Sequence, residues 1–296
     1  FMQGFAALPP KAVPAMAIGG VTGIVLAVLE KTLPARVRRW VPSPASLGLA
    51  FVIPAYNEER RLASTLDAVT GFLAQQPWTW EVRVVDDGSA DGTVRLAQDY
   101  ARREPRVVVQ QEPHRGKGGA VKAGLLAAAG AYRFICDADL SMPIAEVRRF
   151  LPPQLTAFDV AIGSREGTGA RRVGEPAYRH VMGRLFNSVV QWLALPGIED
   201  SQCGFKMFSA DAVQAIFPLV SIDGWAFDVE VLTVARVHGM RVVEVPIEWH
   251  YRNESQVSML RDSVGMLREL LRIRARALRG VYRPRPANAP AVKSGR

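Results

Sequence analysis

Four short, mostly apolar runs alternate with helical patterns over the first half of the chain. The runs cover residues 49–54, 80–85, 106–110 and 134–136, and residues 62–73 carry leucine and valine at helical spacing. Strands that alternate with helices predict an α/β fold with a mostly parallel central sheet and helices on both of its faces. Ligands of such sheets bind beyond the carboxyl ends of the strands, where this chain places its polar clusters.

The boundary between the first strand and the first helix is predicted from Pro54 and Asn57. Proline has no amide hydrogen to give to a sheet, so Pro54 should end the strand. The side-chain oxygen of asparagine often caps the first turn of a helix, so we expect Asn57 to cap the helix that follows.

Two carboxylates, Asp137 and Asp139, follow the fourth run directly. Residues two apart on a strand point to the same side, so both carboxylates should leave the strand together. Oxygen ligands of this kind suit Mg²⁺ or Mn²⁺ that is held together with substrate phosphates. A pair of solvated loop carboxylates is the alternative interpretation.

Six short segments follow one another along the chain: Val52–Glu58, Val85–Ser89, Arg115–Gly119, Asp137–Asp139, Asp200–Lys206 and Phe227–Glu230. In this order they resemble the family-2 glycosyltransferases of the GT-A fold, and the resemblance covers roughly residues 48 to 275. The last two segments resemble the branch of dolichyl-phosphate β-glucosyltransferases.

The resemblance implies inverting transfer of a hexose, glucose from UDP-glucose, to a polyprenyl or dolichyl phosphate at the cytoplasmic face of a membrane. A GDP-mannose-dependent mannosyltransferase and an enzyme that glycosylates a glycan hydroxyl remain open, as does a binding protein without activity. Processive synthases carry Gln-x-x-Arg-Trp after the catalytic base, whereas the only Arg-Trp pair here, Arg39–Trp40, precedes the domain.

The resemblance also assigns the donor half of the site. Asp87 and Glu58 resemble residues that bind the base and the ribose, and the glycine-flanked Lys117 is placed to approach phosphate oxygens. Asp139 is the expected direct ligand of Mg²⁺ or Mn²⁺, while many relatives have glycine where this chain has Leu140, which leaves the third ligand open. The expected donor-binding residues are Pro54, Tyr56, Glu58, Asp87, Ser89, Lys117, Asp137 and Lys206, and the expected metal ligands are Asp139, Asp137 and Ser141.

An arginine-rich stretch predicts the acceptor half. Five arginines lie between residues 165 and 184, and guanidinium groups suit bidentate recognition of phosphate. We expect Arg165 and Arg179 to bind the acceptor, and Asp200, at the position of the base in hydroxyl-directed relatives, to act as a base or to orient the acceptor. Trp225, Asp228 and Glu230 are further candidates to contact the sugar or support the site, and a core role is the alternative for Trp225.

The two ends of the chain are expected to contact a membrane. We divide the chain into a hydrophobic segment with a basic flank (1–47), a GT-A catalytic domain (48–255), and a basic amphipathic helix with a disordered tail (256–296). Residues 12–29 are uncharged and approach the length of a membrane span. The basic residues that follow predict a cytoplasmic catalytic domain, although a hairpin packed on the domain would also explain residues 12–29.

Charge is concentrated at the carboxyl end. Residues 261–296 hold 10 basic and 2 acidic residues, which accounts for most of the net charge of +9. A basic amphipathic helix favours binding to membrane lipid, and an ordinary helix packed on the domain is the alternative. Nucleic acid is not an expected partner, because the basic residues lack interleaved aromatic residues. With two cysteines the chain has no disulfide framework, and its oligomeric state stays open.

Overall fold

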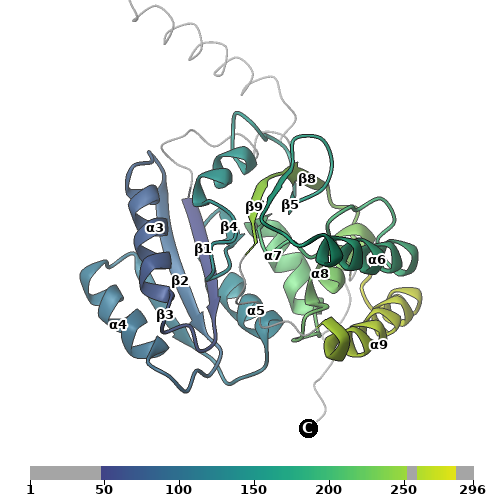
Figure 1. Cartoon of the computed structure of the whole chain (residues 1–296), viewed down its shortest axis with the longest axis horizontal. Helices are drawn as coiled ribbons and strands as arrows, with labels where there is room; N and C mark the ends of the chain where they lie inside the picture. The colour runs from purple at the N-terminus through teal and green to yellow at the C-terminus, as the bar shows by residue number, and fades with distance from the viewer. Residues whose placement is uncertain (1–47, 252–258, 285–296) are drawn as a thin grey trace, which may run out of the picture. The chain divides into compact units, whose positions relative to one another are not determined.

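The computed structural model describes residues 48–251 and 259–284 (Figure 1). The expected membrane segment, residues 12–29, and most of the tail lie outside the described residues. Within the described ranges, none of the helices combines the length and the apolar character that crossing a bilayer requires.

A seven-stranded sheet forms the centre of the described structure, as the alternating pattern predicts. Its strand order is β3-β2-β1-β4-β7-β5-β8, and every neighbouring pair is parallel except the two pairs made by β7. The strands are β1 (Gly48–Ala55), β2 (Thr79–Asp86), β3 (Val107–Gln111), β4 (Tyr132–Ile135), β5 (Val160–Ser164), β7 (Lys206–Ser209) and β8 (Val242–Pro246). Two short strands, β6 (Arg171–Val173) and β9 (Glu248–His250), pair in parallel beside it.

Helices cover both faces of the sheet (Figure 1). The first face carries α3 (Leu62–Ala74), α4 (Thr93–Arg103) and the 3-10 helix η2 (Ile144–Phe150), and the second carries α5 (Lys117–Ala127), α7 (Ala210–Ile216) and α8 (Phe227–Val237). The short 3-10 helix η3 (Phe217–Leu219) follows α7. Outside α8 lies α9 (Met259–Leu278), and α6 (Ala177–Leu193) packs beside α9.

Strand β1 shows why the sheet is buried on both sides. Phe51 and Ile53 belong to the hydrophobic cluster under α3, whereas Ala50 and Val52 belong to the cluster under α5 and α8. Adjacent strand residues point to opposite faces, so a continuous apolar run fits a strand that has helices above and below it.

The strand order reverses between β1 and β4, because β2 and β3 extend to one side of β1 and the later strands extend beyond β4. Open α/β sheets bind their ligands at such a point, beyond the carboxyl ends of the strands. The fold therefore places the residues after β1 and β4 at the expected position of a site.

The predicted cap of the first helix is wrong. Helix α3 begins at Leu62, preceded by Arg61, and Asn57 has a φ of 54°, which is left-handed backbone that cannot continue into a helix. The Asn57 side chain instead accepts a hydrogen bond from the Ala90 amide at 2.9 Å. Asn57 thus ties the loop after β1 to the loop after β2.

The expected carboxyl-terminal helix is present as α9. Leu270 and Ile273 are buried against the domain, in agreement with the alternative of a packed helix, while Leu267, Leu271 and Leu278 of the predicted apolar stripe are exposed. Whether this helix binds lipid stays a prediction.

Candidate active site

The carboxyl ends of β1, β2, β4 and β5 lie along one edge of the sheet. β7 runs antiparallel between β4 and β5, so the segment that leads into β7 reaches the same edge. This topology brings together two groups of predicted residues: a donor group that follows β1, β2 and β4, and an acceptor group that follows β5 and precedes β7.

Asp87 organises the loop in front of α5. Its buried carboxylate accepts hydrogen bonds from the backbone amides of Arg115 and Gly116, both at 2.9 Å. Nδ1 of His114 lies 2.9 Å from the same carboxylate, and the His114 ring stacks on Tyr56 with a centroid distance of 4.3 Å. Asp87 therefore holds a loop and an aromatic pair in place, next to where β1 and β2 end.

Two glycines allow this loop to approach the chain before α8. Gly116 has a φ of 115°, and a β-carbon there would lie 2.7 Å from the carbonyl oxygen of Asp223. The Gly118 amide donates a hydrogen bond to that oxygen at 2.8 Å. Any side chain larger than hydrogen at these two positions would push the two loops apart. The glycines therefore fix the position of the Lys117 backbone between them.

Lys117 joins the glycine-rich loop to the acidic pair. Its Nζ lies 2.6 Å from Oδ1 of Asp137 and 5.9 Å from the ring centre of Trp225. Burial alone would lower the pKa of Lys117, but the negative charges of Asp137, Asp228 and Asp139 outweigh it and raise that pKa. The ammonium is therefore a permanent cation beside the predicted metal ligands.

The carboxylates of Asp137 and Asp139 follow β4 as expected. Oδ1 of Asp139 accepts a hydrogen bond from the Ser141 amide at 2.9 Å, and Leu140 between them has a φ of 44°. Leu140 thus adopts a left-handed conformation that glycine takes more readily, and nothing in the structure explains the leucine at this position.

The acidic pair fits a divalent cation that is completed by substrate. In the part of the chain that the structure describes, no cluster of three or more His, Cys, Asp or Glu side chains forms a metal site by itself. Two hard carboxylates with further positions left to phosphate oxygens and water are a common arrangement for Mg²⁺. Asp139, Asp137 and Ser141 therefore remain the predicted ligands.

Gly204 brings the acceptor segment against the acidic pair. A β-carbon on Gly204 would lie 2.7 Å from Cγ of Asp137, closer than real side chains approach. The segment from Asp200 to Phe205 therefore passes directly beside Asp137, which places the donor and acceptor groups next to one another.

Asp200 and Arg165 form a bidentate ion pair. Nε and Nη2 of Arg165 each lie 2.7 Å from a carboxylate oxygen of Asp200, and the Arg165 amide donates to the same carboxylate at 2.9 Å. Burial by itself would raise the pKa of Asp200, but the Arg165 guanidinium and these hydrogen bonds lower it below the usual range. Asp200 is therefore ionised and held in one orientation.

Two arginines of the predicted acceptor group, Arg165 and Arg179, each lie over an aromatic ring. The Arg165 guanidinium lies 5.3 Å from the ring centre of Trp249, and the Arg179 guanidinium lies 5.3 Å from that of Tyr251. Nε of Arg179 is buried and has no hydrogen-bond partner among the described residues. Buried donors are normally satisfied, so Arg179 is suited to receive an anionic ligand.

Other arginines of the acceptor stretch are engaged by acids. Arg172 binds Glu175 at 2.6 Å and Glu166 at 2.5 Å, and Arg184 lies 3.2 Å from Glu166. Glu166 and Glu175 thus offset part of the positive charge of the arginine-rich stretch. The sequence shows the number of arginines in this stretch but not which acidic side chains they contact.

Lys206 lies behind the site. It is fully buried, and its Nζ is 2.6 Å from Oδ1 of Asp228 and bonds to the carbonyl of Cys203. The structure therefore places Lys206 as the counter-ion of a buried carboxylate and not at the open edge where we expected it to meet the donor.

The remaining predicted donor residues lie at the ends of β1 and β2. Pro54 does not end its strand as predicted, because β1 continues to Ala55. Ser89 Oγ accepts a hydrogen bond from the Asn57 amide at 2.9 Å, and the carboxylate of Glu58 pairs with Arg61. A donor that used Glu58 would have to share it with that guanidinium.

One supporting residue was missed by the sequence analysis. Glu244 in β8 accepts hydrogen bonds from the amides of Asp200 at 3.0 Å and Glu199 at 2.9 Å. Burial raises the pKa of Glu244. A lone glutamate in a predicted strand gives no signal of this role, since the contact spans 44 residues.

Comparison with known proteins agrees with the geometry. The profile described as Glycosyl transferase family 2 matches residues 50–217. A dolichyl-phosphate beta-glucosyltransferase of Dictyostelium discoideum is 33% identical over 249 residues, which cover 79% of this chain and 76% of the relative. The protein of the same name from Drosophila melanogaster is 34% identical over 253 residues, 80% of this chain and 78% of the relative.

Solved structures share the fold at lower identity. Glucosyl-3-phosphoglycerate synthase from Mycobacterium tuberculosis, in complex with Mn²⁺, UDP-glucose and phosphoglyceric acid, superposes with a TM-score of 0.59 at 19% identity. The match covers 78% of this chain and 81% of that one. It supports the GT-A-like architecture.

Proposed function

The chain belongs to glycosyltransferase family 2, and we propose that it transfers glucose from UDP-glucose to a polyprenyl or dolichyl phosphate at a membrane surface. Relatives that carry the name dolichyl-phosphate beta-glucosyltransferase span about four fifths of the chain and support both the sugar and the acceptor. The M. tuberculosis enzyme, which was solved with UDP-glucose and Mn²⁺, supports the donor and the divalent cation.

The observation that carries the proposal is the contact between Gly204 and Asp137. Through it the predicted acceptor segment lies beside the predicted metal ligands, so a phosphate near Arg165 and Arg179 and a sugar diphosphate near Asp137 and Asp139 would be neighbours. Transfer requires this proximity, because the attacking oxygen and the anomeric carbon must come within bonding reach.

The donor diphosphate would be held by Lys117 and the acidic pair. Asp139 and Asp137 would bind Mg²⁺ or Mn²⁺, which when bound stabilises the negative charge of the departing nucleoside diphosphate. Lys117, kept cationic by its carboxylate neighbours, supports the same charge from the protein side. Asp87 would act indirectly by fixing the loop that carries Lys117.

The acceptor would need little help from a base. A phosphate monoester carries about −1.5 to −2 charges at neutral pH, so its oxygen is already a nucleophile. Asp200 has a lowered pKa and is fully engaged by Arg165, which suits positioning better than proton abstraction. This favours a phosphate over a sugar hydroxyl, since a hydroxyl acceptor would require a base.

A transfer assay tests the proposal. Purified full chain in detergent is given polyprenyl phosphate and, in separate reactions, radiolabelled UDP-glucose, GDP-mannose or UDP-galactose, and products are extracted into organic solvent. We expect label in the lipid phase with UDP-glucose only, and none with the Asp139→Asn variant. Label from GDP-mannose alone would replace the proposed donor, and no lipid product from any donor would overturn the proposal.

A further inference from the structure

Helix α6 exposes an apolar stripe along its whole length. The side chains recur at spacings of three and four residues, so they occupy one face about 100° wide. Their exposed fractions run from 38% at Val189 to 82% at Trp192. The stripe consists of Tyr178, Val181, Met182, Leu185, Val189 and Trp192.

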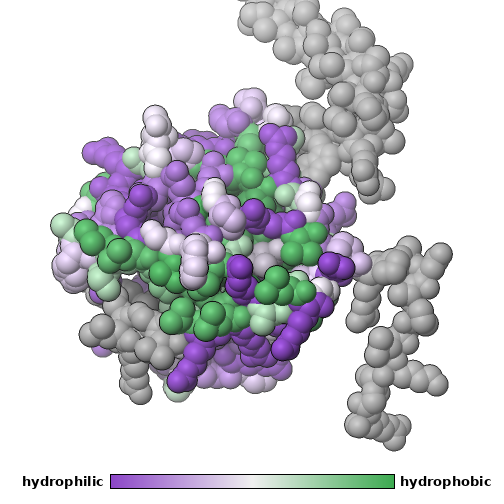
Figure 2. All heavy atoms as spheres, turned by 90° about the vertical axis from the view of Figure 1, so that its right-hand side faces the viewer, coloured by the Kyte–Doolittle hydropathy of each residue, from purple (hydrophilic) through white to green (hydrophobic). Residues whose placement is uncertain are grey.

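Such a face is unusual on a folded domain. The same helix buries Val190 and Leu193 against the domain, so its packing is already satisfied on another side. Exposed apolar side chains that adjoin one another in this way mark interaction surfaces. Figure 2 shows apolar side chains gathered in bands across the face that carries α6 and α9.

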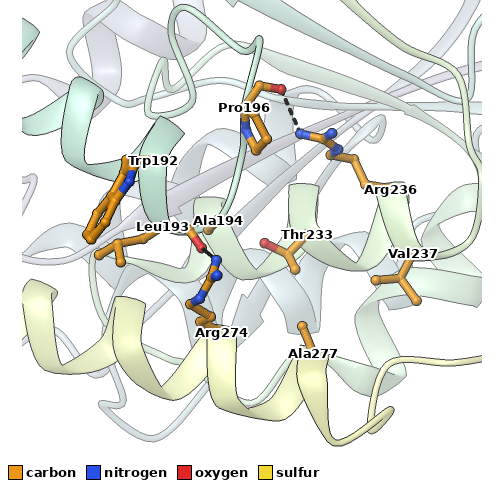
Figure 3. Close-up of a pocket in the computed structure, with 9 residues that line it drawn as sticks. All are labelled: Trp192, Leu193, Ala194, Pro196, Thr233, Arg236, Val237, Arg274 and Ala277. Atoms are coloured by element: carbon orange, nitrogen blue, oxygen red, sulfur yellow. Dashed lines mark hydrogen bonds between the residues drawn. The ribbon is translucent and has the colours of Figure 1, made fainter.

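The stripe continues onto α9 through a groove. The groove measures about 340 Å³ and lies between the end of α6, α8 and α9 (Figure 3). Its walls include Trp192, Val237 and Ala277, and beyond it α9 exposes Leu271. The apolar surface therefore extends over two helices.

Cations lie in and around this surface. Arg274 donates a hydrogen bond to the Leu193 carbonyl at 2.6 Å, and Arg236 donates one to the Pro196 carbonyl at 2.7 Å (Figure 3). These bonds anchor both guanidinium groups in the groove. Each guanidinium has five N–H donors, so further donors remain for a ligand. Further exposed basic side chains are Arg268 and Arg272 on α9 and Arg279 directly after it. Helix α6 itself has no acidic residue.

We propose that this surface, the α6 stripe together with the α6–α9 groove, docks onto an anionic lipid bilayer. Apolar side chains would enter the boundary of the acyl chains while the arginines meet lipid phosphates. Tyr178 and Trp192, near the two ends of α6, have the ring-with-polar-tip chemistry of residues at membrane interfaces.

The position of α6 explains why docking there would serve catalysis. Asn187 donates to the carbonyl of Glu199 at 2.6 Å, beside Asp200, and Arg179 at the start of α6 lies against Tyr251. This step rests on the proposed function: an acceptor with its phosphate near Arg179 would run its prenyl chain along α6 into the bilayer.

A fluorescence experiment tests the docking directly in the full chain. Leu185→Cys and, as matched control, Gln98→Cys on the distant α4 are labelled with an environment-sensitive fluorophore; the native Cys136 and Cys203 are buried. Vesicles contain equal parts of phosphatidylglycerol and phosphatidylcholine. We expect a blue shift and quenching by lipid-borne nitroxide at position 185 and neither at position 98.

Three outcomes would overturn the proposal. The first is no change at position 185 although the protein sediments with the vesicles, and the second is no sedimentation at all. The third is a label at position 185 that is shielded before lipid is added, which would assign the face to a second copy or to residues 1–47. The inactive Asp139→Asn variant should behave as the active chain does, so docking is measured independently of transfer.

A transfer assay then separates docking from the proposed function. Leu185→Asp with Trp192→Asp should lower transfer to long-chain polyprenyl phosphate in vesicles by about tenfold or more, since each burial of a large apolar side chain contributes about that factor. Transfer by this double variant to a water-soluble short prenyl phosphate should be unchanged. The control variants Gln98→Asp and Leu185→Met should transfer to the long-chain and the short-chain acceptor as the unaltered chain does. Equal loss with both acceptors would contradict docking, whereas absent transfer by the unaltered chain would sink the proposed function alone.

Discussion

Gly204 packs directly against the carboxylate of Asp137, with room for no side chain between them: a β-carbon on Gly204 would lie 2.7 Å from Cγ of Asp137. Asp137 in turn lies 2.6 Å from Nζ of Lys117. One glycine thus sets the separation between the acceptor segment and the predicted metal ligands.

The first prediction is that Gly204→Ala displaces Asp137. The added methyl group should cost about 1–3 kcal/mol of unfolding free energy through overpacking. It should lower kcat/KM by about a hundredfold, because a shift of about 1 Å in a reacting group costs roughly that much. Denaturant unfolding and transfer kinetics measure the two effects.

Gly71→Ala is the matched control, since a β-carbon on Gly71 in α3 meets nothing within 4 Å. Its activity should match that of the unaltered chain, and its unfolding free energy should rise by about 0.5–1 kcal/mol because alanine is the better helix former. A Gly204→Ala variant as active as Gly71→Ala would show that the spacing does not matter for transfer.

The second prediction concerns the divalent cation. Asp139→Asn keeps the size of the side chain and the hydrogen bond from Ser141 but removes a charge, so the fold should persist and Mn²⁺ affinity in the presence of UDP should fall at least about tenfold. Calorimetric titration of Mn²⁺ measures this, with Asp99→Asn on the surface of α4 as control. Transfer at full rate in excess chelator would exclude the metal-dependent mechanism.

The order of elements and the position of the acidic pair are predictable because they follow local patterns. Apolar runs and helical spacing identify β1, α3 and β4, and the reversal of strand order places Asp137 at the binding edge. These features depend on residues close together in the chain.

Contacts between distant segments are not predictable in this way. Lys206 looks like a free lysine near a motif, yet it is buried against Asp228 because β7 passes through the middle of the sheet. Asn57 is of a residue type that often caps helices, but its contacts with Ser89 and Ala90 hold it in a left-handed turn. The side of α6 that faces solvent is likewise set by its packing against α9.

The third prediction addresses Arg165. Arg165→Lys keeps the charge but cannot form both hydrogen bonds to Asp200, so the carboxylate should lose its fixed orientation. A lost hydrogen bond to a charged group is worth about 1.5–3 kcal/mol, or about ten- to a hundredfold in acceptor kcat/KM. UDP affinity, measured by calorimetry, should not change. Weaker UDP binding with normal acceptor use would place Arg165 on the donor side.

The last prediction separates positioning by Asp200 from base catalysis. The folded pKa of Asp200 is lowered, so its contribution to stability is complete above its unfolded value of about 3.9 and is lost only as pH falls through the folded pKa. Asp200 should therefore stay ionised from pH 5 to 8, and the acid limb of kcat should follow the acceptor phosphate, whose second pKa is about 6. Asp200→Asn should lower kcat by a similar factor at every pH in that range. If the acid limb of the pH–rate profile instead disappears in Asp200→Asn, then Asp200 is a titrating base, and a hydroxyl acceptor becomes the better assignment.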